Sequence, residues 1–395
     1  MNRLIGTVVR SFRAPIIKES DDVSKIAVDT LLNASKEGNF EINNGDVLAI
    51  TESVVARAQG NYAHVNDIAS DVKNKFENGK VGVIFPILSR NRFAICLRGI
   101  AMGAKEIVLQ LSYPSDEVGN ALISEEILQQ KNLNPFQDLL SDEDFRSHFG
   151  ETKHTFTGVD YISYYRSIIE AAGAKCTIIF SNNPTHILKY TDNVLNCDIH
   201  SRFRTKKALK NLNATVYSLD DILNTPNDNH GFNPEYGLLG SNKSTEDTVK
   251  LFPRNCKELA YKIQEEIKKL TQKTVEVMVY GDGAFKDPVG KIWELADPVV
   301  SPGFTAGLVG TPNEIKLKYL ADNNFAELNG EELKSAILNK IKEKDGSLVG
   351  QMEAQGTTPR HLTDLIGSLC DLTSGSGDKG TPIVYIQGYF DNYAS

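Results

Sequence analysis

Polar residues able to do chemistry follow a buried strand early in the chain, in the segment GDVLAITESVVARAQG at 45–60. Its apolar run, 47–50, is typical of a strand buried on both faces. Glu52, Ser53 and, within the helix that follows, Arg57 are well placed to meet a phosphate or a substrate carboxylate. An ordinary strand-to-helix junction with a capping Thr or Ser is the alternative interpretation.

A second group of polar residues is acidic and lies in GDGAFKDPVGKIWELADP, just beyond another buried strand. Asp282, Asp287, Glu294 and Asp297 offer the carboxylate oxygens that Mg²⁺ and Mn²⁺ prefer, and such ions usually keep phosphate oxygens in the same coordination shell. The alternative is a solvated, charge-rich loop.

Asp160 is a third candidate, in the segment HTFTGVDYIS. Gly158 permits a close backbone approach, and Asp160 stands at a predicted helix start, where simple N-capping is the alternative role.

Asp198 and His200 lie two apart on a predicted strand, so they would share a face and could bind a metal together. A structural pair is the favoured alternative, and Cys197 beside them is interpreted as a small buried hydrophobe.

Two familiar phosphate-binding motifs are excluded by their context. GSGDKG at 375–380 matches GxGxxG by letter but lies between a helix and a following strand, whereas the dinucleotide fingerprint requires strand and then helix. Gly290 and Lys291 resemble the end of a Walker loop, but Ile292 replaces the required Ser or Thr.

The elements that must position these residues alternate between helix and strand. A helix capped by Asp21 or Asp22 precedes the first strand, and apolar residues at helical spacing predict further helices. The expected helices include 68–76, 91–102, 161–172, 259–270 and 362–369, and the expected strands are 47–50, 81–85, 106–111, 176–181, 194–200, 214–219, 275–280 and 382–388. The acidic stretch 112–150 predicts a solvated helical excursion, and 228–250 predicts an ordered surface loop or lid.

Composition limits the classes of function. The 395 residues, 41% of them hydrophobic, allow two or three soluble domains, and the net charge of -8 argues against a broad nucleic-acid surface. The five cysteines form no CxxC pair, so a reducing cytosol fits better than a disulfide framework, and we expect a cytoplasmic protein. No apolar run approaches the length of a membrane helix.

In their order along the chain, these segments resemble the coenzyme F-420:L-glutamate ligase family, the γ-glutamyl ligases that extend the tail of a deazaflavin cofactor. The resemblance rests on APIIKESDD at 14–22, GDVLAITESVVARAQG, TKHTFTGVDYIS at 152–163, DPVGKIW at 287–293, which is similar to the family's DTFGRPW, and DKGTPIVYIQG near the end.

The resemblance implies a role for particular residues. The family's nucleotide contacts fall on Ala14, Pro15, Ile16, Ile17, Glu52, Ser53, Arg57 and Ser163, and its metal-binding aspartates fall on Asp160 and Asp287, with Asp282 as a competing alignment. Arg57 and Asp160 are the implied catalytic residues. This sequence departs from the family at Arg57, where Lys is usual, at Ser163, which replaces Asn, and at Pro288 and Glu294, which replace Thr and Arg.

The family further implies an α+β fold of mixed sheets in a two-part architecture. We expect a ligase-like catalytic region of 1–175 and 251–395 and an inserted α/β segment of 176–250. The implied reaction is amide formation between a carboxylated, cofactor-like acceptor and L-glutamate through an acyl phosphate. It would require GTP or ATP and Mg²⁺ or Mn²⁺, in a homodimer with no nucleic-acid or membrane partner.

Two other functions remain open at this point. A metal-dependent phosphohydrolase would use Asp198, His200 and the acidic turn together and would release phosphate without an amine acceptor. A non-catalytic nucleotide-binding relative would bind a triphosphate without turnover.

Overall fold

The computed structural model describes residues 4–88, 92–116, 119–155, 157–281, 284–286, 293–295, 301–355, 360–375 and 377–394. The chain divides into two compact units. Unit 1 comprises Met1–Val55, Asn255–Gly283 and Val299–Ser395, and unit 2 comprises Ala56–Arg254 and Ala284–Pro298.

Unit 1 is built on a five-stranded sheet of strand order β1-β16-β2-β12-β15. Its strands are β1 (Val8–Phe12), β2 (Val47–Thr51), β12 (Glu276–Tyr280), β15 (Gly303–Phe304) and β16 (Ile383–Gln387). β2 and β12 pair in parallel, and the β1–β16, β16–β2 and β12–β15 pairs are antiparallel. The sheet is therefore mixed, with β2 at its centre.

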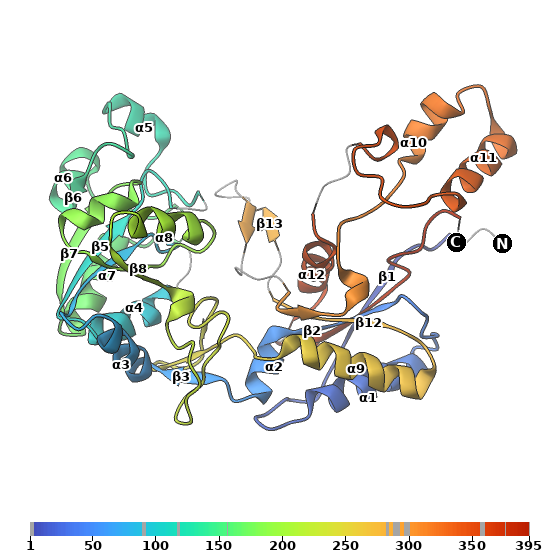
Figure 1. The fold of residues 1–395 in the computed structure, drawn as a ribbon, viewed down its shortest axis with the longest axis horizontal. Helices are drawn as coiled ribbons and strands as arrows, with labels where there is room; N and C mark the ends of the chain where they lie inside the picture. Colours follow the sequence, from blue (N-terminus) through green and yellow to red (C-terminus); the bar gives the residue numbers. More distant parts are fainter. Residues whose placement is uncertain are drawn as a thin grey trace. The chain divides into compact units, whose positions relative to one another are not determined.

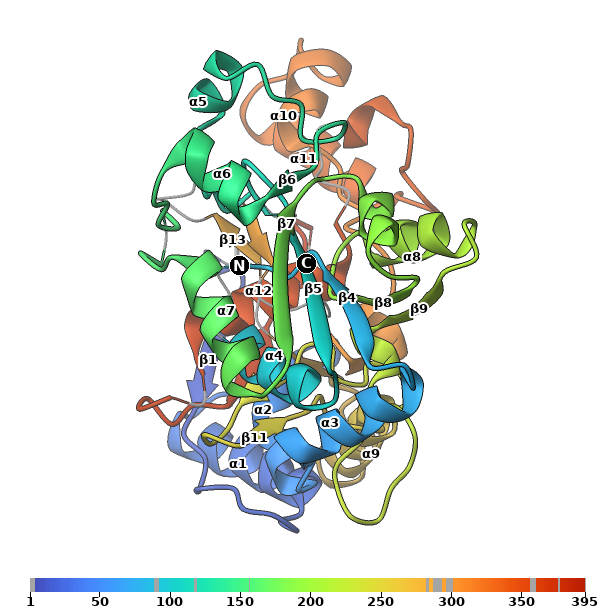
Figure 2. The same cartoon turned by 90° about the vertical axis from the view of Figure 1, so that its left-hand side faces the viewer.

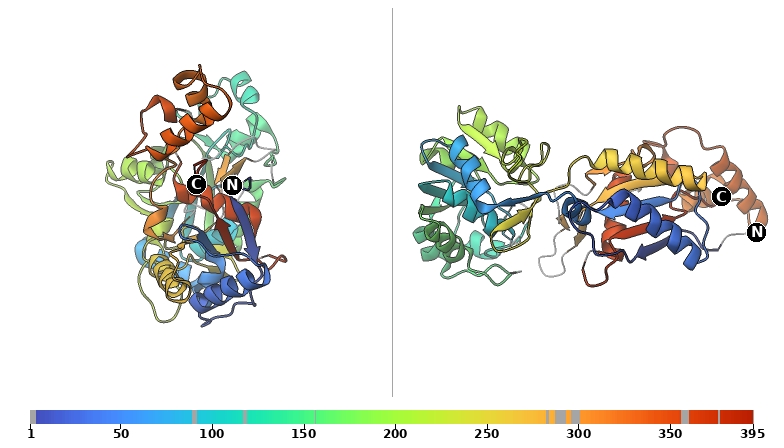
Figure 3. Two further views of the ribbon diagram at one scale, coloured as in Figure 1. Left: turned by 90° about the vertical axis from the view of Figure 1, so that its right-hand side faces the viewer. Right: turned by 90° about the horizontal axis from the view of Figure 1, so that it is seen from below.

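The helical elements of unit 1 include two long helices that pack against each other. Its helices are α1 (Val23–Glu37), α2 (Glu52–Ala58, which runs into unit 2), α9 (Cys256–Thr271), α10 (Leu317–Tyr319), α11 (Gly330–Lys342) and α12 (Leu362–Thr373), with short turns η3 (Ala306–Leu308), η4 (Leu320–Asn324) and η5 (Met352–Ala354). Helices α1 and α9 lie side by side below the sheet, and α12 lies above it (Figures 1 and 3).

Local sequence explains the central elements of unit 1. Asp22 caps α1, as one of the two predicted caps, by accepting a hydrogen bond from the Lys25 backbone N–H at 3.2 Å. All five residues of β2 are buried, which confirms the predicted strand. Helix α12 packs on one face of this sheet, where Ile366 and Cys370 share an apolar cluster with Val47 and Ala49 of β2.

Unit 2 is built on a six-stranded sheet of strand order β6-β7-β5-β4-β8-β9. Five of its strands run parallel, and β6 pairs antiparallel with β7 at one edge (Figure 2). The strands are β4 (Lys80–Ile84), β5 (Glu106–Leu111), β6 (Leu140–Ser141), β7 (Lys175–Phe180), β8 (Asn193–Asn196) and β9 (Thr215–Ser218).

Helices and two small sheets complete unit 2. The helices are α3 (Val65–Lys75), α4 (Arg92–Met102), α5 (Glu125–Gln130), α6 (Asp142–Phe149), α7 (Tyr161–Ala171) and α8 (Arg202–Lys210), with η1 (Pro184–Lys189) and η2 (Leu219–Asp221). The short strands β3 (Tyr62–His64), β10 (Asn242–Lys243) and β11 (Thr248–Lys250) form one small sheet, and β13 (Ala284–Lys286) pairs with β14 (Trp293–Leu295) in the other.

Three expectations about local structure need correction. The strand predicted at 194–200 ends at Asn196, because Asp198 turns the chain by accepting a hydrogen bond from the Ser201 backbone N–H at 2.8 Å. The stretch 112–150 is partly helical, as expected, with α5 and α6, but it also adds strand β6 to the sheet. The loop predicted at 228–250 contains β10 and β11, since β11 pairs with β3.

The α+β class with mixed sheets is confirmed. The division into a catalytic region of 1–175 and 251–395 and an inserted segment of 176–250 stays a prediction. The two compact units are defined by contacts, and contacts do not show which segment was inserted. In the part of the chain that the structure describes, no helix is long and apolar enough to cross a membrane.

Candidate functional site

The sheet of unit 1 brings three segments that are distant in sequence to one edge. The register aligns Phe12, the last residue of β1, with Ile383, and Ile383 with Ile50 of β2. β1 and β2 therefore run in the same direction and end at the same edge. The segment 14–17 leaves β1 there, and Glu52 and Ser53 follow β2 there.

Strand β12 ends at this edge too. It pairs in parallel with β2, and its last residue, Tyr280, is opposite Thr51. Asp282 follows two residues later in the sequence, but Asp282 and Asp287 both lie outside the described residues. The structure thus sets the start of the acidic turn beside the start of α2, since the carboxyl ends of adjacent parallel strands share one edge.

The predicted nucleotide contacts at this edge differ in exposure. Ile16 is 82% exposed, whereas Ile17 is buried. Ala14 is tied to the C-terminal turn by its backbone N–H, which donates to the Gly380 carbonyl at 3.1 Å. Pro15 is exposed, so the segment offers both fixed backbone and accessible side chains.

Helix α2 carries the remaining candidates of this segment. Glu52 is buried in its first turn, where a carboxylate interacts favourably with the positive end of the helix dipole. Ser53 beside it is half-buried. Arg57 lies in the last turn and is exposed, so its guanidinium is accessible to an anion.

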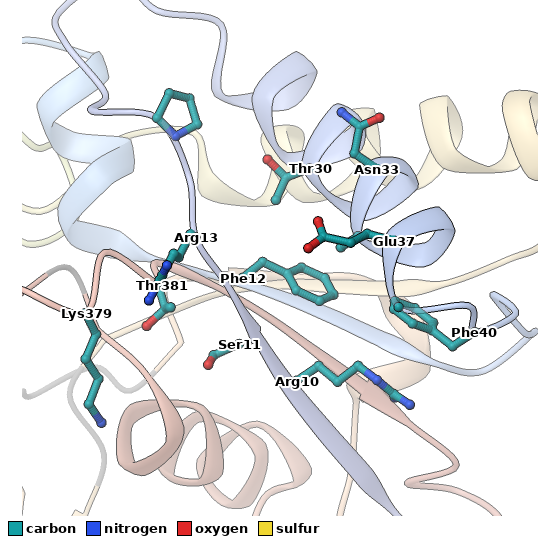
Figure 4. Close-up of a pocket in the computed structure, with 13 residues that line it drawn as sticks. Arg10, Ser11, Phe12, Arg13, Thr30, Asn33, Glu37, Phe40, Lys379 and Thr381 are labelled. Carbon is teal, nitrogen blue, oxygen red and sulfur yellow. The ribbon is translucent and has the colours of Figure 1, made fainter.

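A pocket of about 990 Å³ lies in unit 1 next to the 14–17 segment (Figure 4). It is lined by Arg10, Ser11, Phe12, Arg13, Pro15, Thr30, Asn33, Ala34, Glu37, Gly38, Phe40, Lys379 and Thr381. Arg13, Thr381 and Lys379 lie along one side, and Thr30, Asn33 and Glu37 of α1 lie along the other.

Sequence reasoning missed the three cations of this pocket. Arg10 is engaged, because it donates to Gln387 Oε1 and stacks over Phe40, with 4.4 Å from its guanidinium carbon to the ring centroid. Arg13 and Lys379 are exposed and add positive charge beside Pro15. In the sequence, Lys379 of GSGDKG was the one indication of a cation near an anion site. Only the pairing of β1 with β16 places it in the same pocket as Arg13.

Asp160 and Ser163 are brought together in unit 2, at the start of α7. Asp160 Oδ1 accepts hydrogen bonds from the Ile162 and Ser163 backbone N–H groups at 3.1 and 3.2 Å. Its Oδ2 accepts from the Ser163 hydroxyl at 2.8 Å and from Arg146 Nη2 at 2.9 Å. The N-capping alternative therefore describes the observed geometry, and Arg146 is a partner that no local pattern indicated.

These contacts fix the charge of Asp160. Burial alone would raise the pKa of Asp160, but the hydrogen bonds from Arg146 and Ser163 outweigh it and hold that pKa below its usual value. The carboxylate is thus ionised at neutral pH, as a metal ligand must be.

The turn before Asp160 is closed by His154. The His154 backbone N–H donates to the Val159 carbonyl at 2.9 Å, and the Gly158 N–H donates to the His154 carbonyl at 2.8 Å. His154 Nδ1 accepts from the Thr157 N–H at 3.1 Å, and burial lowers the pKa of the imidazole. A neutral, buried His154 thus shapes the loop that delivers Asp160 to the helix start.

The described residues do not by themselves assemble a metal centre. Among them, no three His, Cys, Asp or Glu side chains gather closely enough to hold an ion. The carboxylate of Asp160 is a suitable metal ligand, but Arg146 donates to its Oδ2, which a metal ion would have to share. Asp282 and Asp287, the other two predicted ligands, lie outside the described ranges.

The predicted Asp198–His200 pair does not share a strand face, because both residues follow the end of β8. Asp198 is buried, and its Oδ2 accepts hydrogen bonds from the Ser201 and Thr205 hydroxyls at 2.7 and 2.8 Å. His200 is exposed. Asp198 therefore has a structural role, as in the favoured alternative.

Comparison with known proteins decides the family. The model of the F420-0:Gamma-glutamyl ligase family matches residues 11–388. The chain belongs to this family. None of the curated proteins matches the chain. The biosynthetic arginine decarboxylase SpeA from Campylobacter jejuni aligns over 93% of this chain and 67% of that chain at 9% identity, with a TM-score of 0.14.

The match to the F420-0:gamma-glutamyl ligase family includes the segments at the sheet edge of unit 1, and their role as a site stays a prediction. It covers the 14–17 segment, Glu52, Ser53 and the end of β12 in one continuous alignment range. The departures at Pro288 and Glu294 lie where the structure describes no side chains.

Proposed function

We propose that this protein is a γ-glutamyl ligase that forms an amide bond between a carboxylated, cofactor-like acceptor and L-glutamate through an acyl phosphate, at the expense of GTP or ATP. One observation carries the proposal. The match to the ligase family spans 11–388, and the ends of β1, β2 and β12, where we propose part of the nucleotide site, lie at one edge of the unit 1 sheet.

The proposed reaction has two transfers. The acceptor carboxylate attacks the γ-phosphorus, and the nucleoside diphosphate leaves. The amine of L-glutamate then attacks the acyl carbon, inorganic phosphate leaves, and the amine loses its proton. Holding both substrates in one site supplies the positional advantage and keeps water from the acyl phosphate.

The chain's own residues have distinct tasks in this proposal. Arg57 stabilises the charge on the transferring phosphoryl group, and Glu52 and Ser53 contact the nucleotide. The segment 14–17 forms part of the nucleotide site. Arg13 and Lys379 give the adjoining pocket the positive charge that suits a polyphosphate.

Asp160, Asp282 and Asp287 are the proposed ligands of Mg²⁺ or Mn²⁺, which would neutralise phosphate charge when bound. The ionised state of Asp160 supports this role, and Arg146 would have to release one oxygen. Because the other two aspartates lie outside the described residues, we assign no reaction step to the metal. Ser163 completes the proposed contacts, and we expect a cytoplasmic homodimer.

A turnover assay with GTP or ATP, L-glutamate and a panel of carboxylated acceptors tests the proposal, with Asp160→Asn as the sharpest variant. Asn keeps the N-cap but removes the negative charge, so the fold should persist while activity falls roughly 100-fold or more. Asp160→Ala and Asp287→Ala should lose activity as well.

Three results would count against this assignment. Full activity in Asp160→Asn and Asp287→Ala would remove these residues from the site. Phosphate release that does not depend on an amine acceptor would instead indicate a phosphohydrolase, and triphosphate binding without turnover would indicate a non-catalytic relative.

A further inference from the structure

A second pocket, separate from the one in unit 1, opens at a particular place in the unit 2 sheet. From β4 the chain proceeds to β5 and β7 in one direction, then crosses to β8 on the other side of β4 and continues to β9 (Figure 2). The order of connection therefore reverses between β4 and β8. In open parallel sheets, ligands bind outside the carboxyl ends of the strands at such a reversal.

The pocket lies at these carboxyl ends and has a volume of about 500 Å³. The segments after four parallel strands contribute to it, together with helix α8. It is lined by Phe85, Ser112, Ser115, Asp116, Phe136, Asn182, Asn183, Pro184, Asp198, Ser201, Arg204, Thr205 and Ala208. A pocket of this size accommodates one small metabolite.

The lining combines three kinds of chemical group. Phe85 and Phe136 offer aromatic faces. Asp198 is a buried carboxylate whose Oδ2 accepts from two hydroxyls near the start of α8, while its Oδ1 accepts from the Ser201 N–H and retains a second lone pair for a ligand hydroxyl. Asp116 is buried too, but its oxygens accept from the Leu88 N–H and from Asn120, so it supports the wall. Arg204 is an exposed cation for which the described residues provide no ion pair.

The walls are held in place before any ligand enters. Gln110 Nε2 donates to the carbonyls of Ser181 and Asn183 at 2.9 and 2.8 Å and so fixes the loop after β7. Asn182 Oδ1 accepts from the Tyr113 backbone N–H at 2.9 Å. This bond orients the side chain, so that the amide nitrogen of Asn182 is its donor to a ligand. The pocket is therefore preorganised.

We propose that this pocket binds a nucleoside monophosphate, as a site distinct from that of the triphosphate consumed in the proposed ligase reaction. The base packs against Phe85 and Phe136, a ribose hydroxyl donates to Asp198 Oδ1, and Arg204 and Asn182 hold the phosphate. A dinucleotide does not fit the sequence, because the segment after β4, FPILSRN, has no glycine for a pyrophosphate turn.

Isothermal titration of the full chain with AMP, GMP, UMP, CMP and inorganic phosphate tests the proposal. We expect at least one mononucleotide to bind at a single site. Variants of the pocket residues should show that this site lies in unit 2. Arg204→Ala should weaken that binding about tenfold or more, because it removes a charge-assisted hydrogen bond. Phe136→Ala should weaken mononucleotide binding without changing phosphate binding.

Both side chains are exposed, Phe136 by 66%, so the variants should fold, and a melting curve verifies this. Lys207→Ala is the matched control, since Lys207 is an exposed cation on the same helix but outside the pocket. Arg13→Ala controls for mononucleotide bound in unit 1. Neither control should change the affinity of the unit 2 site.

Three results would overturn the proposal. The first is that no mononucleotide binds at millimolar concentration, and the second is that only inorganic phosphate binds. The third is that Arg13→Ala abolishes mononucleotide binding while Arg204→Ala leaves it intact. Because a monophosphate has no γ-phosphate to transfer, the outcome is independent of whether the ligase reaction occurs.

Discussion

The carboxylate of Asp160 combines the observed capping of α7 with the ligand role that we propose for it. It accepts two backbone N–H groups at the start of α7, one hydroxyl and one guanidinium. Each of these donors favours the ionised form, which outweighs the effect of burial on its pKa. Arg146 therefore maintains the negative charge and would also compete with any cation for the same oxygen.

His154 should make stability depend on pH near neutrality. Its pKa is lowered in the folded protein by burial, so the unfolded chain binds a proton more readily. The stabilisation from neutral His154 is thus fully present above about pH 6.5, the ordinary value, and is lost as the pH falls below it. The melting temperature of wild type relative to His154→Gln should decline between pH 7.5 and pH 5.5.

The control for this experiment is His361→Gln, which removes an exposed histidine instead. Gln at position 154 can still accept the Thr157 N–H but does not titrate in this range. A constant difference in melting temperature between wild type and His154→Gln across this range would show that burial of His154 has no effect on acid stability.

At the scale of elements, helices α3 and α4 pack closely because Gly99 of α4 and Gly103, which directly follows α4, face α3. A Cβ built on Gly99 would lie 2.8 Å from Ile68 Cβ, and one built on Gly103 would lie 2.4 Å from the Ala69 carbonyl oxygen. Both distances are shorter than van der Waals contact, so only glycine permits this approach of the helices.

Gly103→Ala should therefore destabilise unit 2 by about 1–3 kcal/mol, the usual cost of overpacking, because a backbone atom must move. Chemical denaturation measures the change. Gly6→Ala is the control, since a Cβ at Gly6 meets no atom within 4 Å. Equal stability of Gly103→Ala and wild type would contradict the close packing of α3 and α4.

At the scale of the whole molecule, each unit has a core of its own. In unit 2, Phe145 and Phe180 stack with ring centroids 3.9 Å apart, and Tyr113 meets the Phe180 ring edge-on. In unit 1, the Tyr385 hydroxyl donates to buried Asp46. Asp46 directly precedes β2, so it lies at the opposite end of that strand from the candidate site. Separate cores allow separate local unfolding.

Phe180→Ala should destabilise unit 2 by roughly 3–5 kcal/mol, the typical cost of deleting a buried Phe side chain. Hydrogen exchange should then accelerate in β5 and β7 but not in β2 and β12. Tyr385→Phe, which removes one hydroxyl in unit 1, is the reciprocal control. Faster exchange spread equally over both units would show that they unfold as one.

The sequence alone determined the elements whose signals are local. The apolar run of β2, the helical spacing of α12 and the Asp22 cap depend on a few neighbouring residues, and all were predictable. Family motifs likewise marked Glu52, Ser53 and Asp160 by their letters. The predictions of β2, α12 and the Asp22 cap succeeded because hydrogen bonding within a segment and burial of one face are encoded in that segment. The functional roles of Glu52, Ser53 and Asp160 stay predictions.

Only the tertiary structure decided which segments meet. The pairing of β1, β16, β2 and β12 gathers residues separated by more than 200 positions, and no local pattern records strand order. Arg146 on Asp160, Lys379 beside Arg13 and the pocket at the end of β4 and β8 follow from such pairing. Long-range contacts depend on the packing of whole elements. Candidate residues could therefore be predicted from the sequence, whereas the residues that contact them are determined by the tertiary structure.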